Sequence, residues 1–232
     1  MLFFALSLFP LTADAGSMFN GMSKQGTDLY GSAIEMVTDS GDVLDVVVAD
    51  TVKANGVIWY QLTFKDVNVC GEDGWGLFVD GVWDASGNRL DEAVFGKHIV
   101  DKSFSCDTGV IAKCVDWGYD PAIVGSDAHL TCTRMARADY CGDGESWTED
   151  GTLIDVFDDL GVWPYKGNGQ GQGFSFEAGW GPDGAVCVQK TRYREREDPK
   201  CFEELPRCSS WKSALHEGAW LGNASSRNAH TD

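Results

Sequence analysis

The sequence predicts an α+β protein that is stapled by disulfides, with an antiparallel β-rich N-terminal half, two central helices and a C-terminal β-hairpin. Three observations predict this class. Alternating apolar residues and turn signals fill residues 31–106, two helical patterns follow in residues 107–141, and the chain carries eight cysteines. With 232 residues, we expect one domain over residues 16–222, whose last part, residues 142–222, is a loop and hairpin region.

An apolar leader opens the chain. Residues 1–15 end in Ala13-Asp14-Ala15, a pattern that is typical of signal-peptide cleavage. The apolar run is too short to cross a bilayer, and no cysteine lies at the cleavage point for lipid attachment. We therefore predict an exported protein (periplasmic, cell-surface or secreted) without a transmembrane segment in the mature chain. A buried N-terminal strand or helix is the alternative for this run.

The chain is strongly acidic, with a formal net charge of −18 at pH 7. This charge argues against nucleic-acid partners and against binding to an anionic membrane surface. It suits an exported protein or a cation binder, whose partner we expect to be an extracellular ligand or protein.

Eight cysteines in an exported chain predict up to four disulfides, whose connectivity the sequence leaves open. The spacings lack a C-x-x-C pair, so a zinc module is not favoured. Two pairings are open. Cys201 can pair with Cys208 across a short loop. Cys70 and Cys106 can link strands of the β-rich half, or each can equally pair with a cysteine of the helices. The predicted disulfide residues are Cys70, Cys106, Cys114, Cys132, Cys141, Cys187, Cys201 and Cys208.

Residues 31–106 predict a small antiparallel sheet or an open barrel. Strand-like runs cover Ile34–Thr38, Val43–Val48 and Val57–Phe64, and Asn55-Gly56 is a strong hairpin signal. In the third run, alternate apolar residues point to one face and Trp59 to the other. Further strand-like runs cover residues 75–79, 82–84 and 98–104.

Two helices are predicted in the centre of the chain. The first begins after Asp107 or Thr108 as N-cap and stops near Gly118. The second begins after Ser126 or Asp127 as N-cap and runs to Tyr140. On such a helix Cys132 and Cys141 lie roughly 13 Å apart along the axis, and a disulfide needs α-carbons within about 7 Å. We therefore predict different partners for these two cysteines.

The C-terminal part is predicted to be less regular. Phe174–Trp180 and Ala185–Arg192 form a hairpin around Pro182-Asp183-Gly184, and the glycine-rich residues 167–173 form a surface loop. The alternating bases that follow suggest an anion-binding strip or, as we favour, a solvated strand face. These bases are Lys190, Arg192, Arg194 and Arg196. Residues 223–232 are expected to be a disordered polar tail.

The run Arg137–Gly144, with the sequence R-A-D-Y-C-G-D-G, resembles the bacterial ADYC domain family. Matching segments precede it at Ala112-Lys113-Cys114 and Trp117-Gly118-Tyr119. The resemblance continues from residues 25–27 to residues 151–152 and 180–184, and so covers most of the chain. It implies an exported domain and no particular chemistry. One departure is Trp147, where the family is expected to favour a histidine, so a mechanism built on that histidine would not operate here.

The second helix and the loop after it carry the candidate catalytic residues, which are His129, Arg134, Arg137, Asp139 and Asp143. A histidine with a carboxylate could perform acid–base chemistry, and paired arginines could hold a carboxylate or an oxyanion. Because His129 and Asp139 lie about 15 Å apart along a helix, a site would need a partner such as His98, Asp143 or Asp155. The favoured alternative is that these charges are buried and satisfied by neighbours.

We therefore expect an extracytoplasmic binding or structural domain. The alternative is a hydrolase or other acid–base enzyme built around the helix His129–Cys141 and the loop Gly142–Asp150.

No cofactor is expected, with calcium as a minor alternative. Asp139, Asp143 and Asp150 have the spacing of an EF-hand loop, but Cys141 takes the third ligand position, where it is a poor ligand for a hard cation. Tryptophans could form a carbohydrate platform if several are exposed, although most are expected in the core. The tryptophans considered are Trp75, Trp83, Trp147, Trp163, Trp180, Trp211 and Trp220.

Overall fold

The computed structural model describes residues 17–19, 26–38, 42–90, 94–95, 98–99, 101–162, 173–193 and 197–226. The predicted signal peptide, most of the glycine-rich loop, Trp163, Arg194 and Arg196 lie outside the described residues. His98 is described by its backbone alone.

The N-terminal half forms an antiparallel sheet in the order β3-β2-β1-β11-β6-β4-β5. β3 also pairs with β4, so the sheet closes into a barrel and β5 lies outside the ring. The sequence had predicted a small antiparallel sheet or an open barrel. Two short pairs, β7 with β8 and β9 with β10, lie beside it. The elements are β1 (Ser17–Phe19), η1 (Gly26–Leu29), β2 (Ala33–Val37), β3 (Val43–Ala54), β4 (Val57–Phe64), β5 (Val67–Asn68), β6 (Gly76–Asp80), β7 (Val82–Trp83), β8 (Arg89–Leu90), β9 (Val94–Phe95), β10 (His98–Ile99) and β11 (Lys102–Cys106).

Alternation along the strands fills the barrel. Tyr60 and Leu62 of β4 are buried, as predicted, and they pack with Ile34, Val46 and Phe104. The β3–β4 hairpin turns at Asn55-Gly56, which have φ angles of 52° and 85°. A two-residue turn of this kind needs the left-handed conformation at both positions, and asparagine and glycine tolerate it best.

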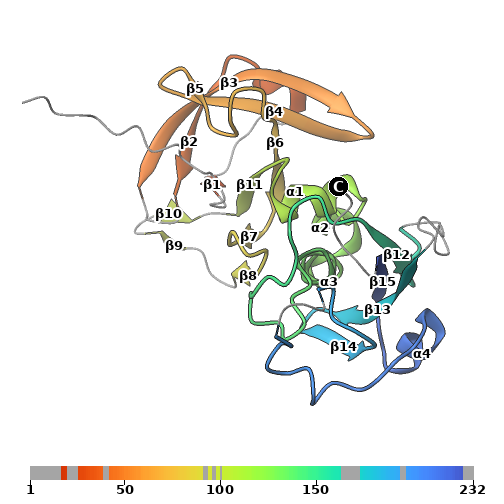
Figure 1. Ribbon diagram of the computed structural model, residues 1–232. Coiled ribbons are helices and arrows are strands. Elements are labelled where there is room, and N and C mark those ends of the chain that lie inside the picture. Colours follow the sequence, from red (N-terminus) through yellow and green to blue (C-terminus); the bar gives the residue numbers. More distant parts are fainter. Residues whose placement is uncertain are drawn as a thin grey trace, which may run out of the picture.

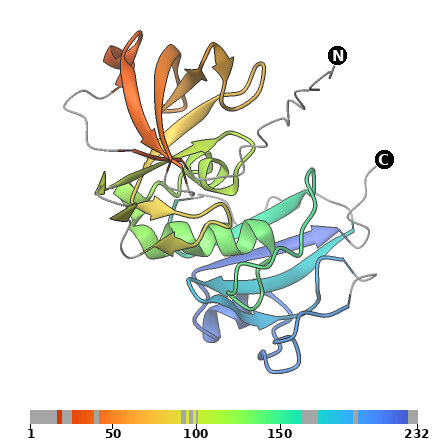
Figure 2. The ribbon, with the colours of Figure 1, turned by 90° about the vertical axis from the view of Figure 1, so that its left-hand side faces the viewer.

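Three helices connect the barrel to a second sheet (Figures 1 and 2). They are α1 (Val110–Asp116), α2 (Pro121–Val124) and α3 (Ser126–Arg137). α1 packs against β6 and β11, α3 packs against the second sheet, and the two helices pack on each other. α2 was not predicted. It is a single turn that begins at a proline and is capped by the Asp120 side chain, which accepts a hydrogen bond from the N–H of Ala122.

The helix ends differ from the predicted ones. Gly109 precedes α1, so neither Asp107 nor Thr108 is its N-cap. α3 ends at Arg137 and not at Tyr140, because Ala138 adopts the left-handed conformation with φ 53°. The residues after Ala138 therefore leave the helix axis and turn toward the second sheet.

The second sheet is antiparallel in the order β12-β15-β13-β14. Its elements are β12 (Ile154–Asp158), β13 (Phe174–Gly181), β14 (Gly184–Val188) and β15 (Leu221–Ser226), and α4 (Trp211–His216) packs on β13 and β15. The predicted hairpin is β13–β14, although β14 ends at Val188 and not at Arg192. The polar tail predicted from Asn223 onward is wrong over residues 223–226, because these residues form the central strand β15. Asn223 is buried there and accepts a hydrogen bond from the Trp180 indole at 2.8 Å.

All eight cysteines form disulfides: Cys70–Cys106, Cys114–Cys132, Cys141–Cys201 and Cys187–Cys208. Cys132 and Cys141 have different partners, as predicted. The open pairing of Cys201 with Cys208 is wrong, since the N–H of Cys208 donates to the carbonyl of Val188 and holds this cysteine beside β14 and Cys187. None of the helices among the described residues has the length and apolar character needed to cross a membrane.

Candidate functional site

The family-like motif after α3 is held by its own contacts. Asp139 is fully buried, forms an ion pair with Arg134, and accepts the N–H groups of Asp143 at 3.1 Å and Gly144 at 2.9 Å. Arg134 also donates from Nε to the carbonyl of Pro182 at 3.3 Å. The carboxylate therefore joins the end of α3 to the following loop. These contacts use both of its oxygens.

The next residues fasten the loop to the second sheet. The Tyr140 hydroxyl donates to Oε1 of Glu177 at 3.0 Å and accepts the N–H of Arg192 at 2.8 Å. Cys141 is bonded to Cys201. Gly142 has φ +67°, and a Cβ at this position would lie 1.9 Å from the carbonyl oxygen of Asp183, so the loop can approach β14 only with glycine here.

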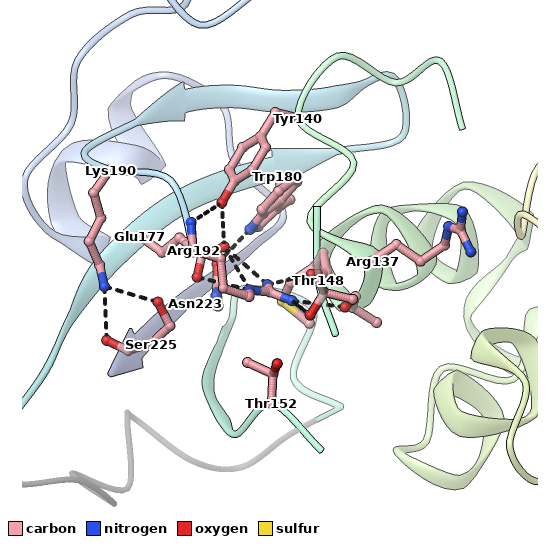
Figure 3. Close-up of polar contacts among 12 residues, drawn as sticks. Arg137, Tyr140, Thr148, Thr152, Glu177, Trp180, Lys190, Arg192, Asn223 and Ser225 are labelled. Atoms are coloured by element: carbon pink, nitrogen blue, oxygen red, sulfur yellow. Dashed lines mark hydrogen bonds and ion pairs between the residues drawn. The ribbon is translucent and has the colours of Figure 1, made fainter. Parts of the chain in front are cut away.

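Arg192 and Glu177 form a buried ion pair beneath this loop (Figure 3). All five N–H groups of Arg192 have acceptors: Glu177 on Nε and Nη2, the carbonyls of Met135 and Ala136 at the end of α3, and the hydroxyl of Thr148. Burial alone would raise the pKa of Glu177, but the guanidinium of Arg192 outweighs it and holds this pKa below its usual value. The guanidinium also balances the negative end of the α3 dipole.

This network corrects the expectation of a solvated strand face, since Arg192 is 2% exposed. Lys190 donates to the carbonyl and hydroxyl oxygens of Ser225 and is likewise not a free surface charge. The sequence did contain one signal for the network. Glu177 interrupts the apolar run of β13, and a carboxylate at such a position requires a buried partner.

His129 is enclosed on the opposite side of α3. Its Nδ1 lies 2.6 Å from the carbonyl oxygen of Tyr119, and its ring centroid is 4.5 Å from that of Trp83. Nε2 is buried and has no hydrogen-bond partner among the described residues. Burial lowers the pKa of His129 to about 4, so the ring is neutral at pH 7. The structure does not bring His129 and Asp139 together.

Asp143 lies at the surface of the loop. Its Oδ2 is 2.6 Å from the Lys200 ammonium, and Oδ1 accepts the N–H of Glu145. The hydrogen bond from Lys200 lowers the pKa of Asp143. Among the described residues, no group of three or more histidine, cysteine or acidic side chains is arranged to hold a metal ion. Asp139 of the suggested calcium loop is instead paired with Arg134.

A cleft of about 590 Å³ lies between the start of α1, the rim of the barrel and the loop 146–154. Of the five candidate catalytic residues, Arg137 lines it and the other four do not. Arg137 donates from Nη2 to the carbonyl of Gly144 at 2.9 Å, while its buried Nε has no partner among the described residues. Figure 3 shows its side chain directed away from the Arg192 network. Other polar groups at the cleft are Thr108, Lys113, Ser146, Thr148, Glu149, Asp150, Thr152 and Arg192.

A second hollow, of about 500 Å³, lies on the other side of Lys113 and Trp117. We call it the tryptophan groove, and its lining residues are Val52, Trp59, Trp75, Asp107, Lys113, Asp116 and Trp117. Trp83 and Trp180 are fully buried, as expected of core tryptophans, whereas Trp75, Trp147, Trp211 and Trp220 are half-buried. Trp59 and Trp117 were not considered as a platform, although the alternation along β4 does place Trp59 outside the barrel.

A family model described as the ADYC domain matches residues 26–194, which include strands β2 to β11, helices α1 to α3 and the β13–β14 hairpin. Neither a curated protein nor a solved structure matches the chain.

Proposed function

The chain belongs to the ADYC domain family. We propose that it is an exported ligand-binding domain. Because the residues of its motif are engaged in internal contacts, we place the binding site in the cleft beside Arg137. Four disulfides support the exported location, since such bonds persist in oxidising compartments and are rare in the cytosol. The leader sequence supports the same location.

Arg137 is the observation that carries the proposal. It lines a cleft of the size that small ligands occupy, and its buried Nε–H has no acceptor among the described residues. An unpaired buried donor costs roughly 1–3 kcal/mol. A shift of the half-buried Arg137 side chain toward an acceptor in the cleft would recover that cost. Arg134 and Asp139, by contrast, are paired with each other and with backbone groups.

A hydrolase is the second candidate, because Glu149 and Asp150 line the same cleft as Arg137. The predicted acid–base pair does not support it, since His129 and Asp139 lie apart. Incubation of a bound ligand with the mature chain separates the two candidates. Cleavage that is lost on Glu149→Gln or Asp150→Asn favours the enzyme, and an intact ligand favours the binding domain.

The test of the binding site is a thermal-shift screen of the mature, oxidised chain against small carboxylates, phosphates, amines and sugars. A ligand at a hundred times its Kd stabilises the folded state by about 2.7 kcal/mol. We expect a compound that raises the Tm of the wild type and not that of Arg137→Met. Arg207→Met is the matched control, because Arg207 is an exposed arginine that does not line the cleft. A compound that stabilises all three proteins equally would contradict the proposed site.

A further inference from the structure

The tryptophan groove combines three half-buried indole rings with charged groups of both signs. Trp59, Trp75 and Trp117 supply the rings, Asp107 and Asp116 supply exposed carboxylates, and Lys113 supplies an ammonium group. All three rings are half-buried and line the same hollow, so each leaves part of its surface open to a ligand. An indole ring of this kind, apolar on its face and polar at its N–H, suits contact with a ligand that is itself partly apolar.

The walls of the groove are fixed by the fold. Trp59 lies opposite Val52 in the β3–β4 hairpin, which extends beyond the rest of the barrel (Figure 1). The N–H of Asp107 donates to the Trp75 carbonyl at 2.7 Å, and the N–H of Trp75 donates to Oδ2 of Asp107 at 3.4 Å. The Cys70–Cys106 disulfide links the segments that carry these two residues. Trp117 lies at the end of α1, which Cys114–Cys132 fastens to α3. A groove fixed in this way loses little entropy when a ligand binds.

The charges select the class of ligand. A cation would gain from the indole faces and the carboxylates, but it would meet the Lys113 ammonium in the same hollow. An anion would be repelled by Asp107 and Asp116 and by the net charge of −18. An uncharged sugar avoids both conflicts. Its hydroxyl groups donate to carboxylates and accept from an ammonium, and its apolar ring faces stack on indole rings.

We propose that the tryptophan groove binds an uncharged oligosaccharide. This inference rests on the proposed function and extends it, because Lys113 and Trp117 line both the groove and the cleft. Lys113 and Trp117 thus form a wall common to both hollows, and a chain of several sugar units would cross these two residues to reach the side of Arg137. The cleft continues this path with hydroxyl and carboxylate groups, including Thr108, Ser146 and Glu149.

Isothermal titration calorimetry of the mature chain tests the proposal with cellohexaose, maltohexaose, mannohexaose and hexa-N-acetylchitohexaose as uncharged probes. We expect one of the four to bind, and Trp75→Ala and Trp117→Ala to weaken its Kd by about tenfold or more. Trp220→Ala is the matched control, since Trp220 is a half-buried tryptophan that does not line the groove. Because Trp117 packs against the core, Asp116→Asn provides a second variant on an exposed side chain that leaves folding intact.

The outcomes separate the groove from the cleft. Loss of binding in Trp75→Ala and Asp116→Asn supports the groove. If Arg137→Met then binds as the wild type does, the groove stands and the cleft proposal fails. Sugar binding that Arg137→Met abolishes and Trp75→Ala leaves unchanged overturns the groove and leaves the cleft. Binding of tetramethylammonium with no binding of any hexasaccharide overturns the sugar proposal.

Discussion

Replacement of Arg192 by methionine is expected to destabilise the chain strongly, because it leaves Glu177 buried without its partner charge. The two side chains are 1% and 0% exposed, and their closest atoms, Nη2 and Oε1, are 3.0 Å apart. Removal of one partner from such a pair costs roughly 3–5 kcal/mol. The carbonyls of Met135 and Ala136 also lose their donors at the end of α3. We expect the free energy of unfolding to fall by about 4 kcal/mol at pH 7.

The loss should depend on pH with a definite sign. In the wild type the pKa of Glu177 lies below its unfolded value, so its contribution to stability is present above that value and is lost as the pH falls. In Arg192→Met, burial is no longer outweighed, and the pKa of Glu177 rises above the unfolded value of about 4.3. A protonated Glu177 needs no counter-charge, so the difference between the two proteins should shrink below about pH 4 and widen toward pH 7.

Urea unfolding followed by tryptophan fluorescence at pH 3.5, 5 and 7 measures this difference. Arg207→Met serves as control, since the 3.9 Å contact of Arg207 with exposed Glu203 is worth less than about 1 kcal/mol. Glu177→Gln in the Arg192→Met background should recover part of the loss, because it removes the unpaired charge. A loss below 1 kcal/mol at pH 7, or an equal loss at all three pH values, would refute the reasoning.

Three further predictions concern the fold. Because burial lowers the pKa of His129 to about 4, below its unfolded value of about 6.5, the chain should lose about 3 kcal/mol as the pH falls from 6.5 to 4, and His129→Phe should lack this loss in urea titrations. Gly142→Ala should cost at least about 2 kcal/mol more than Gly31→Ala in thermal unfolding, since both positions have positive φ but an added Cβ meets backbone atoms at Gly142 alone; equal costs would mean that the loop can move away. Thiol labelling of the denatured, unreduced chain should find no free cysteine. The double variant Cys114→Ser with Cys132→Ser should lower the free energy of unfolding by about 3 kcal/mol, and an unchanged Tm would contradict this value.

Local signals predicted much of the barrel and the helices. Strand β4 has the bounds expected from its alternation, and Asn55-Gly56 forms the expected hairpin turn, because both patterns act over a few neighbouring residues. The separate partners of Cys132 and Cys141 were predicted in the same way. The N-cap of α3 is Gly125, so neither Ser126 nor Asp127 is the cap that the sequence predicted. The closure of the barrel was not, since it depends on β3 pairing with two strands at once.

The candidate site was less accessible from the sequence because its contacts are long-range. Arg192 lies in a run of alternating charges, and nothing local distinguishes it from a surface arginine until Glu177 is placed beside it. Strand β15 has the sequence L-G-N-A-S-S, whose small and polar residues resemble a tail, but they fit a central strand that is covered on both sides. The tryptophan groove joins residues from β4, the turn before β6 and the end of α1.

The four letters that define the motif each have a separate structural task. Ala138 ends the helix, Asp139 holds the loop, Tyr140 reaches the buried ion pair and Cys141 bonds to Cys201. A signature of this kind identifies a scaffold and does not identify a ligand. Two proteins that share it can therefore bind different molecules, and knowledge of one member's ligand cannot be transferred through the motif. Comparisons of ligand specificity between family members should instead be made at residues that line the tryptophan groove or the cleft, namely Trp59, Trp75, Asp116, Trp117 and Arg137.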